Sequence, residues 1–187
     1  MNQELPTWNP EDKEESLKRL ATAFNELARF TFLKDGTHVQ LAFLVDGNGE
    51  LGMIPPMAGD PAAFISLVKS QVTARQPFGV IHVAETWAYL RRSPNDHTFT
   101  QVALGEIRVS ELAQGEKTEA LMVRMESSGG TAKIWFSPIL RGGAAKVSLA
   151  DPIVLDPAAG RTLRQFLFLR FPYRSRNPSS APRNMWA

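Results

Sequence analysis

The stretch Gly79–Leu90, GVIHVAETWAYL, decides our interpretation of the fold. It is the longest run in the chain that is rich in β-branched and aromatic residues, and apolar side chains fall on both faces of an extended backbone. Such a run is typical of a strand that is covered on both sides. We therefore predict a central strand here.

Two hairpins are predicted on either side of this strand. The turns Asp46-Gly-Asn-Gly49 and Ser127-Ser-Gly-Gly130 supply the residues that tight turns between antiparallel strands require. Pro138 favours an edge position or a bulge, because proline cannot donate a ladder hydrogen bond. The strands predicted beside the central one are 39–45, 50–54, 118–126, 131–140 and a short 147–149 within an otherwise loop-like 141–156.

Three helices are predicted, each starting where a capping residue precedes a proline. Asn9-Pro10 starts a helix over 10–31, with acidic residues in its first turn and Asp35-Gly36 beyond its end. Asp60-Pro61 starts a helix that stops before Pro77, and Asp156-Pro157 starts a third that runs to about Phe171.

This order of elements predicts an α+β protein, with a mostly antiparallel sheet of about five or six strands and three helices packed on it. We expect an N-terminal arm at 1–9, a single domain at 10–171 and a basic, mobile tail at 172–187.

Composition limits the chemistry that this chain can perform. The 187 residues carry a net charge of +2 and include no cysteine, which excludes disulfides, thiolate metal sites and a cysteine nucleophile. No secretory signal pattern starts the sequence and no apolar run approaches the length of a membrane span. We expect a cytoplasmic protein with no membrane contact, no cofactor and no bound metal.

Three catalytic patterns fail on their context. Gly47–Gly52 matches G-x-G-x-x-G, but Pro55-Pro56 follows where a dinucleotide site needs a helix. Ser66 and Lys69 have the spacing of a serine acyl-enzyme without its other elements, and they fit the solvated side of a helix. His82 and Glu85 project to opposite faces of a strand, so a core or surface histidine is the simpler interpretation.

Glu85 and Glu119 are the weak catalytic candidates. Each lies among apolar residues on one face of a predicted strand, where an unpaired carboxylate would be costly. If the two strands are neighbours, the acids could share a cleft and perform acid–base chemistry. The alternative is a structural role, with Arg108, Arg124, an indole or hydroxyl donor, backbone amides or solvent in a cleft as partners for Glu85.

The chain after Asp156 contains six arginines, no acid and several aromatic residues. Arginine neutralises phosphate and aromatic rings stack on bases, so single-stranded nucleic acid is a possible ligand of this segment. Helical spacing of Leu163, Phe166, Leu167 and Phe171 instead indicates a final core helix. Residues predicted to bind nucleic acid or a protein partner are Arg161, Arg164, Arg170, Tyr173, Arg174, Arg176 and Trp186, the last as an aromatic anchor.

Three short motifs resemble an uncharacterised group of short bacterial and phage proteins. They are Glu85-Thr-Trp87, Glu119-Ala-Leu121 with the hairpin at 127–130, and His38 on the first strand. The resemblance implies a prokaryotic or phage setting and an α+β sheet, and it carries no activity. Glu116-Lys117 stands where such proteins often have proline and arginine.

Because the catalytic patterns fail on their context, the sequence indicates a small non-enzymatic binding protein. We expect it to bind a protein partner, to belong to an assembly or to form a homo-oligomer. The alternatives are single-stranded nucleic-acid binding through the C-terminal segment and a hydrolase or lyase that uses Glu85 and Glu119.

Overall fold

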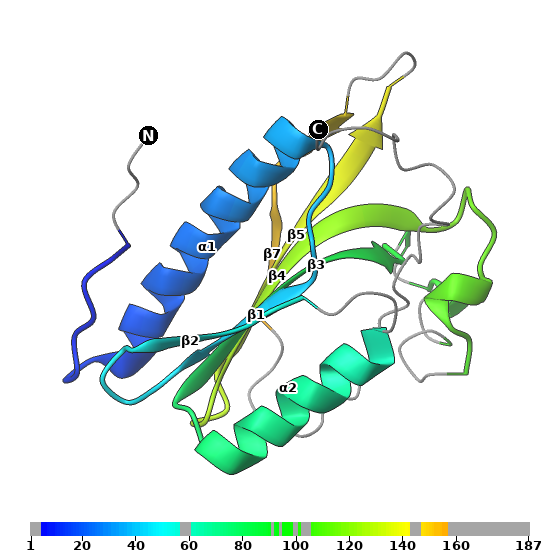
Figure 1. Ribbon diagram of the computed structural model, residues 1–187. Helices are drawn as coiled ribbons and strands as arrows, with labels where there is room; N and C mark the ends of the chain where they lie inside the picture. Colours follow the sequence, from blue (N-terminus) through cyan, green and yellow to red (C-terminus); the bar gives the residue numbers. More distant parts are fainter. Residues whose placement is uncertain are drawn as a thin grey trace, which may run out of the picture.

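The computed structural model describes residues 5–56, 61–90, 92–93, 95–98, 101, 106–142 and 147–156, and a seven-stranded antiparallel sheet forms its centre (Figure 1). The strand order is β2-β1-β3-β4-β5-β6, and β7 also pairs with β5. The elements are α1 (Lys13–Asp35), β1 (Leu41–Val45), β2 (Leu51–Ile54), α2 (Pro61–Arg75), β3 (Gly79–Ala88), the 3-10 turn η1 (Val109–Glu111), β4 (Thr118–Ser127), β5 (Ala132–Arg141), β6 (Val147–Leu149) and β7 (Ile153–Leu155).

The α+β class and the antiparallel sheet are confirmed, with more strands than the five or six predicted. The additional strand is β7, which lies in a stretch that the sequence indicates as loop. Two helices, α1 and α2, pack on the sheet in the described part of the chain, rather than three. The third predicted helix, from Pro157 to Phe171, and the tail at 172–187 lie outside the described residues.

The predicted central strand is confirmed as β3, which ends at Ala88 rather than at Leu90. It pairs with β1 along one edge and along its whole length with β4 on the other. Its side chains alternate between two covered faces. Ile81 and Val83 contact the cluster formed with α1, whereas Val80 packs in the cluster under α2.

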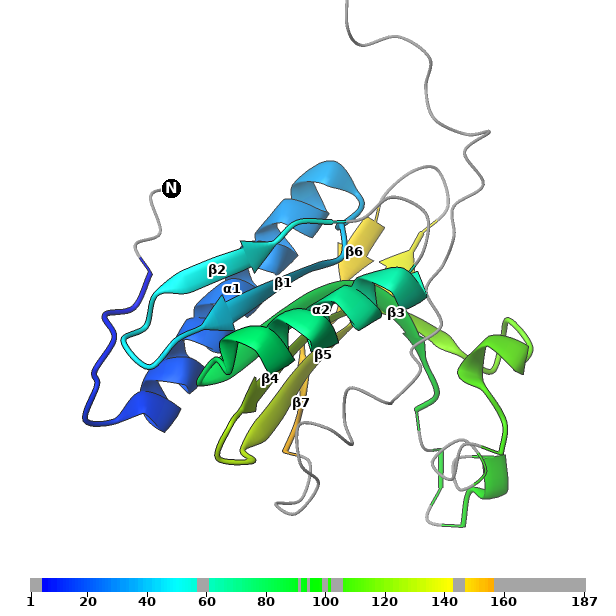
Figure 2. The same ribbon diagram turned by 60° about the horizontal axis from the view of Figure 1, so that its bottom comes forward.

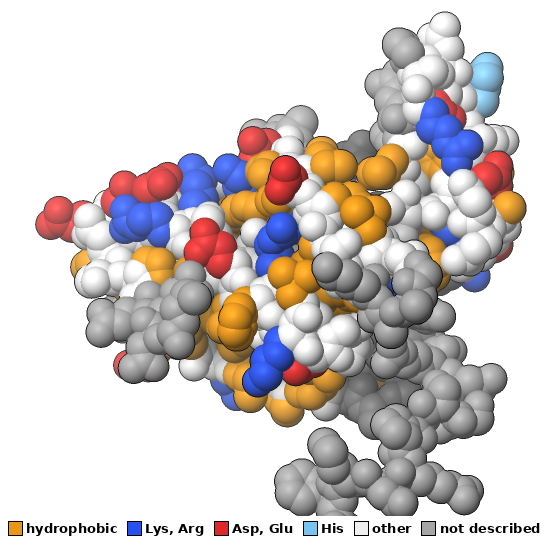
Figure 3. All heavy atoms as spheres, turned by 90° about the horizontal axis from the view of Figure 1, so that it is seen from above, with side chains coloured by type: hydrophobic (Ala, Val, Ile, Leu, Met, Phe, Trp, Pro, Cys, Tyr) orange, Lys and Arg blue, Asp and Glu red, His pale blue; other side chains and the backbone are white. Residues whose placement is uncertain are grey.

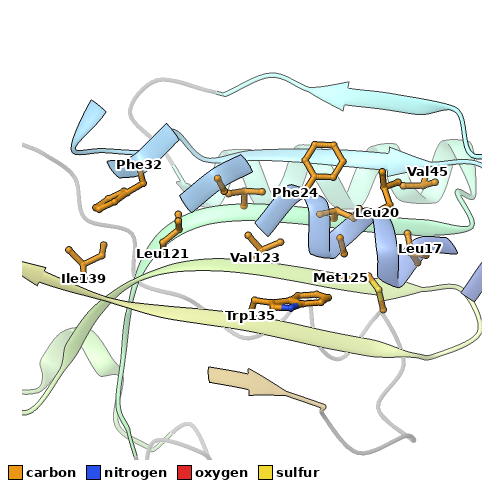
Figure 4. Packing of buried hydrophobic residues seen from close by; sticks show 14 residues of the cluster. Leu17, Leu20, Phe24, Phe32, Val45, Leu121, Val123, Met125, Trp135 and Ile139 are labelled. Carbon is orange, nitrogen blue, oxygen red and sulfur yellow. The ribbon is translucent and has the colours of Figure 1, made fainter. Parts of the chain in front are cut away.

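The two helices lie on opposite sides of the sheet, with α2 in front of the strands and α1 behind them in Figure 2. The larger core lies between α1 and the strands, and Figure 4 shows the side chains of α1 meeting those of β4 and β5. These core residues include Leu17, Leu20, Phe24, Phe32, Leu121, Val123, Met125, Trp135 and Ile139.

The N-cap of α1 is Asp12, and the prediction of Asn9 was wrong. The Asp12 carboxylate accepts a hydrogen bond from the Glu15 backbone N–H, at 3.4 Å. The Asn9 side chain instead accepts from Glu11, and its carbonyl accepts from Asp12, so that Asn9 stabilises the turn before the helix. Gly36 caps the end of the helix, as the Asp35-Gly36 signal indicates, but α1 starts at Lys13 and continues to Asp35, so the predicted range 10–31 was wrong at both ends.

Pro138 lies where β5 changes its outer neighbour. Ile134–Phe136 pair with β7 and Ile139–Arg141 pair with β6, while the Pro138 carbonyl accepts from Ala150 on the same outer side. The N–H and C=O of one residue in an antiparallel strand point to the same neighbour. The N–H that proline lacks would therefore have pointed into the gap between β6 and β7.

Both predicted tight turns contain a glycine at positive φ, Gly49 at 86° and Gly130 at 89°. Their surroundings differ. A Cβ on Gly49 would lie 2.3 Å from Cγ of Trp8, whereas a Cβ on Gly130 would meet no atom within 4 Å. The Gly49 turn is thus held against the Trp8 ring, which in turn packs edge-on against Phe78.

We predict that Gly49→Ala destabilises the protein more than Gly130→Ala. Both substitutions place a Cβ on a left-handed backbone, at a cost of about 1–2 kcal/mol. Only Gly49→Ala also displaces Trp8, which adds about 1–3 kcal/mol. Urea unfolding of the two variants measures the difference, and equal losses would show that Trp8 does not rest on the turn.

Candidate functional site

The structure brings Glu85 and Glu119 to one face of the sheet. Their strands are neighbours, and the register pairs Glu85 with Leu121 and Trp87 with Glu119. Glu85 and Glu119 are therefore diagonal neighbours on the side of the sheet that α1 covers. The sequence predicts that the two acids lie close together only if their strands are neighbours, and this condition is met.

Glu119 forms a two-pronged ion pair with Arg141 of β5. Nε of Arg141 donates to one carboxylate oxygen at 2.7 Å, and Nη2 donates to the other at 2.6 Å. The hydrogen bonds to Glu119 raise the pKa of Arg141, against a smaller opposing effect of burial, and the charges of Glu119 and Glu85 add to the increase. The guanidinium thus lies in the field of both acids.

Glu85 is held by the segment that follows α1. Its Oε1 accepts a hydrogen bond from Oγ1 of Thr37 at 2.8 Å and another from the His38 backbone N–H. Gly36 ends the helix, and the next two residues reach β3. A hydroxyl group and a backbone amide are among the partners that the sequence predicts for Glu85.

The predicted arginine partners of Glu85 were wrong. Arg124 pairs in register with His82 and lies on the opposite face of the sheet, and Arg108 lies near Glu111 at 3.8 Å. Arg141 engages both oxygens of Glu119, and Oε1 of Glu85 accepts two hydrogen bonds, so these carboxylate oxygens already have partners within the fold. This geometry therefore favours a structural role for both acids over acid–base chemistry.

We predict that Thr37→Val lowers the free energy of unfolding by about 1–3 kcal/mol, because it leaves a half-buried carboxylate with one donor fewer. Thr22→Val is the matched control, since the Thr22 hydroxyl donates to Lys18 on the exposed side of α1. Urea unfolding gives both values. A Thr37→Val loss no larger than that of Thr22→Val would remove the structural role assigned to this contact.

His82 belongs to a separate polar cluster on the α2 side. It stacks on Phe64, its Nε2 lies 3.1 Å from the Gln40 side-chain nitrogen, and Arg124 lies opposite it on β4. Arg124 forms a buried ion pair with Glu126. Burial lowers the pKa of Arg124 to about 9. The prediction that His82 and Glu85 face apart is confirmed, and His82 is a half-buried histidine of this cluster.

Burial, and less strongly the charge of Arg124, lowers the pKa of His82 from 6.5 to about 4. The unfolded chain therefore takes up a proton at a higher pH than the folded protein, so acid favours unfolding. We predict that this contribution is complete above pH 6.5 and is lost as the pH falls towards 4, by up to about 3 kcal/mol.

The measurement is urea unfolding between pH 4 and pH 7 of the wild-type protein, His82→Gln and His97→Gln. Stability of the His82→Gln variant should depend less on pH over this range, because its side chain does not titrate. His97 is exposed, and its substitution should leave the wild-type slope unchanged. An unchanged slope in His82→Gln would contradict the assignment.

An apolar groove lies beside Glu85, between α1 and β1. Its volume is about 320 Å³, and its polar end is formed by Asp35, Thr37 and His38. Thr37 and His38 are also the residues that hold Glu85, so Glu85 lies at this end of the groove. The apolar lining includes Phe24, Leu27, Ala28, Leu41, Phe43 and Val83.

Exposed hydrophobic side chains extend the groove. Leu27 of α1 is 43% exposed, Val39 is 54% exposed and Met53 of β2 is 59% exposed. Met53 pairs with Phe43 and so projects to the α1 side of the sheet. Figure 3 shows hydrophobic side chains gathered in the middle of the molecule, between groups of charged residues. We call the groove with these three residues the apolar groove surface.

Sequence reasoning missed this surface, although one signal was available. Helix α1 contains more large apolar residues than one buried stripe can use, since Phe30 and Leu33 are exposed as well as Leu27. All seven predicted C-terminal binding residues lie outside the described residues. They are Arg161, Arg164, Arg170, Tyr173, Arg174, Arg176 and Trp186, and their role stays a prediction.

Among the described residues, no group of three histidine, aspartate or glutamate side chains is arranged to hold a metal ion. No helix in this part of the chain has the length and apolarity to cross a membrane. Comparison of the chain with protein-family models, curated proteins and solved structures gives no match. The resemblance to short bacterial and phage proteins therefore stays a prediction.

Proposed function

We propose that this is a small non-enzymatic binding protein and that an extended apolar segment of another protein binds at the apolar groove surface. The observation that carries the proposal is the position of this groove beside an open edge of the sheet. Strand β2 is the last strand on its side, and no described strand pairs with its outer edge.

The register of β2 supports a polypeptide ligand. Leu51 and Met53 pair with Val45 and Phe43, so both side chains lie on the face that carries the groove. A strand added to β2 would gain backbone hydrogen bonds, and every second side chain of that strand would point towards the groove. A compact apolar molecule could fill the groove but could not use the backbone groups on the outer edge of β2, which pair with no described strand.

The acid pair supports binding rather than catalysis. Glu119 is occupied by Arg141, and Glu85 is occupied by donors from Thr37 and His38. The contacts of Thr37 and His38 with Glu85 tie the polar end of the groove to β3. A pre-formed surface lowers the ordering cost of binding. The setting that we propose for this complex is an assembly in the cytoplasm of a bacterium or a phage-infected cell.

We predict that peptides selected from a random displayed library against the full-length protein are apolar at every second position. Their dissociation constants, measured by fluorescence anisotropy, should rise at least tenfold with Met53→Asp or Leu27→Asp, which is about 1.4 kcal/mol. Val154→Asp is the matched control, because Val154 is 45% exposed on β7, away from the groove. Circular dichroism confirms that each variant folds.

Equal binding to the wild-type protein and the two groove variants, or a library that gives no binding peptide, would contradict the proposal. Sedimentation velocity of the wild-type protein is run in parallel. A dimer that Met53→Asp converts to a monomer would identify the partner as a second copy of this chain.

A further inference from the structure

Hydrogen bonding at the β1–β2 turn determines which backbone groups of β2 point outward. The Asp46 N–H donates to the Glu50 carbonyl at 3.1 Å, and this pair is next to the pair of Val45 and Leu51 in the register. In an antiparallel ladder, pairs that exchange hydrogen bonds alternate with pairs that do not. Because Asp46 and Glu50 are bonded, Leu51 belongs to a pair whose backbone groups point away from each other.

The N–H and C=O groups of Leu51 and Met53 therefore face away from β1, whereas those of Gly52 and Ile54 face β1. No described strand pairs with the outer edge of β2. The side chains of Leu51 and Met53 lie on the groove side of the sheet and are exposed. The same two residues thus present an open backbone edge and apolar side chains beside the groove.

This open edge is bounded at both ends. Two residues before Leu51, the Gly49 N–H donates to the Asp46 carbonyl within the turn, at 3.2 Å. Two residues after Met53, Pro55 has no N–H. Leu51 and Met53 therefore supply the N–H donors of this edge, which limits the contact to a short segment of the partner.

The short edge favours an antiparallel segment over a parallel one. In the antiparallel arrangement, one residue of the segment exchanges two hydrogen bonds with Leu51, and another, two positions away, exchanges two with Met53. A parallel segment needs a further residue, at the next alternate position, to make the same bonds. A longer stretch of a parallel segment thus becomes ordered, and each ordered residue costs conformational entropy.

We propose that the segment bound at the apolar groove surface lies antiparallel to β2, and that two of its residues, two positions apart, pair with Leu51 and Met53 through their backbones. This inference rests on the proposed function and specifies its ligand. Side chains of directly opposite residues lie on the same face of a sheet. The residues that bind through their backbones are therefore those whose apolar side chains point towards the groove. In a parallel segment, the donating residues would have their side chains on the α2 face.

Single N-methylation of a peptide separates these arrangements, because it removes one backbone donor and keeps the side chain. The probe is the tightest-binding peptide from the random displayed library, made with one N-methyl residue at each position in turn. Fluorescence anisotropy measures its binding to the full-length protein. We expect the dissociation constant to rise at least tenfold at two apolar positions, two residues apart. N-methylation of the residue between them is the matched control and should change it less than twofold.

Large effects at the residues between the apolar positions would overturn the antiparallel arrangement. Equal effects at all positions, or no effect at any, would overturn the pairing with β2. In each of these cases a peptide that Met53→Asp weakens leaves the proposed function in place. A library that gives no binding peptide would overturn both proposals.

A disulfide measures the direction of the segment independently, since the natural chain has no cysteine. Glu50 is exposed and directly precedes β2, so an antiparallel segment brings its C-terminal end to Glu50. The Glu50→Cys protein is oxidised with the same peptide, extended by a cysteine at either end. A disulfide requires Cα atoms within about 7 Å. We expect the C-terminal cysteine to cross-link at least tenfold more than the N-terminal one, and the reverse ratio or equal amounts would overturn the proposal.

Discussion

The alternation of side chains along the β3–β4 ladder is the constraint on which the rest of the structure depends. Every residue of β3 has a partner in β4, so the face that one residue takes determines the face of all the others. This alternation places Glu85 and Glu119 with α1, and His82 and Arg124 with α2. A shift of one residue in the pairing of a strand would move all of its side chains to the opposite face of the sheet. Each core would then receive the side chains of the other, and both polar clusters would lie among apolar residues.

Much of the fold could be predicted because its signals are local. The central strand, the two glycine-containing turns and the end of α1 at Gly36 each depend on residues close together in sequence. The N-cap depends on a finer competition, in which Asp12 faces the Glu15 N–H and Asn9 does not. Strand β7 was missed because Ile153–Leu155 is apolar at all three positions, whereas the equally short β6 alternates as Val147-Ser-Leu149.

The candidate site was predictable only in part. Glu119 and Arg124 are five residues apart on one strand, so alternation places their side chains on opposite faces of the sheet. Because Glu85 lies on the face of Glu119, Arg124 could have been rejected as its partner from the sequence. The actual partners of Glu85 lie 47 and 48 residues away and are brought to it by the end of a helix. The apolar groove is lined by residues of both α1 and β1, so no pattern within a single segment predicts it.

The two edges of the sheet differ, and this difference bears on the stoichiometry of the complex that we propose. At one edge, Pro138 divides the outer boundary of β5 between two three-residue strands, which offer another molecule little continuous backbone. At the other edge, β2 is uninterrupted. A molecule with one receptive edge and one divided edge cannot stack head to tail without limit. If a partner adds to β2 as we propose, the complex should therefore be one-to-one rather than a growing fibre.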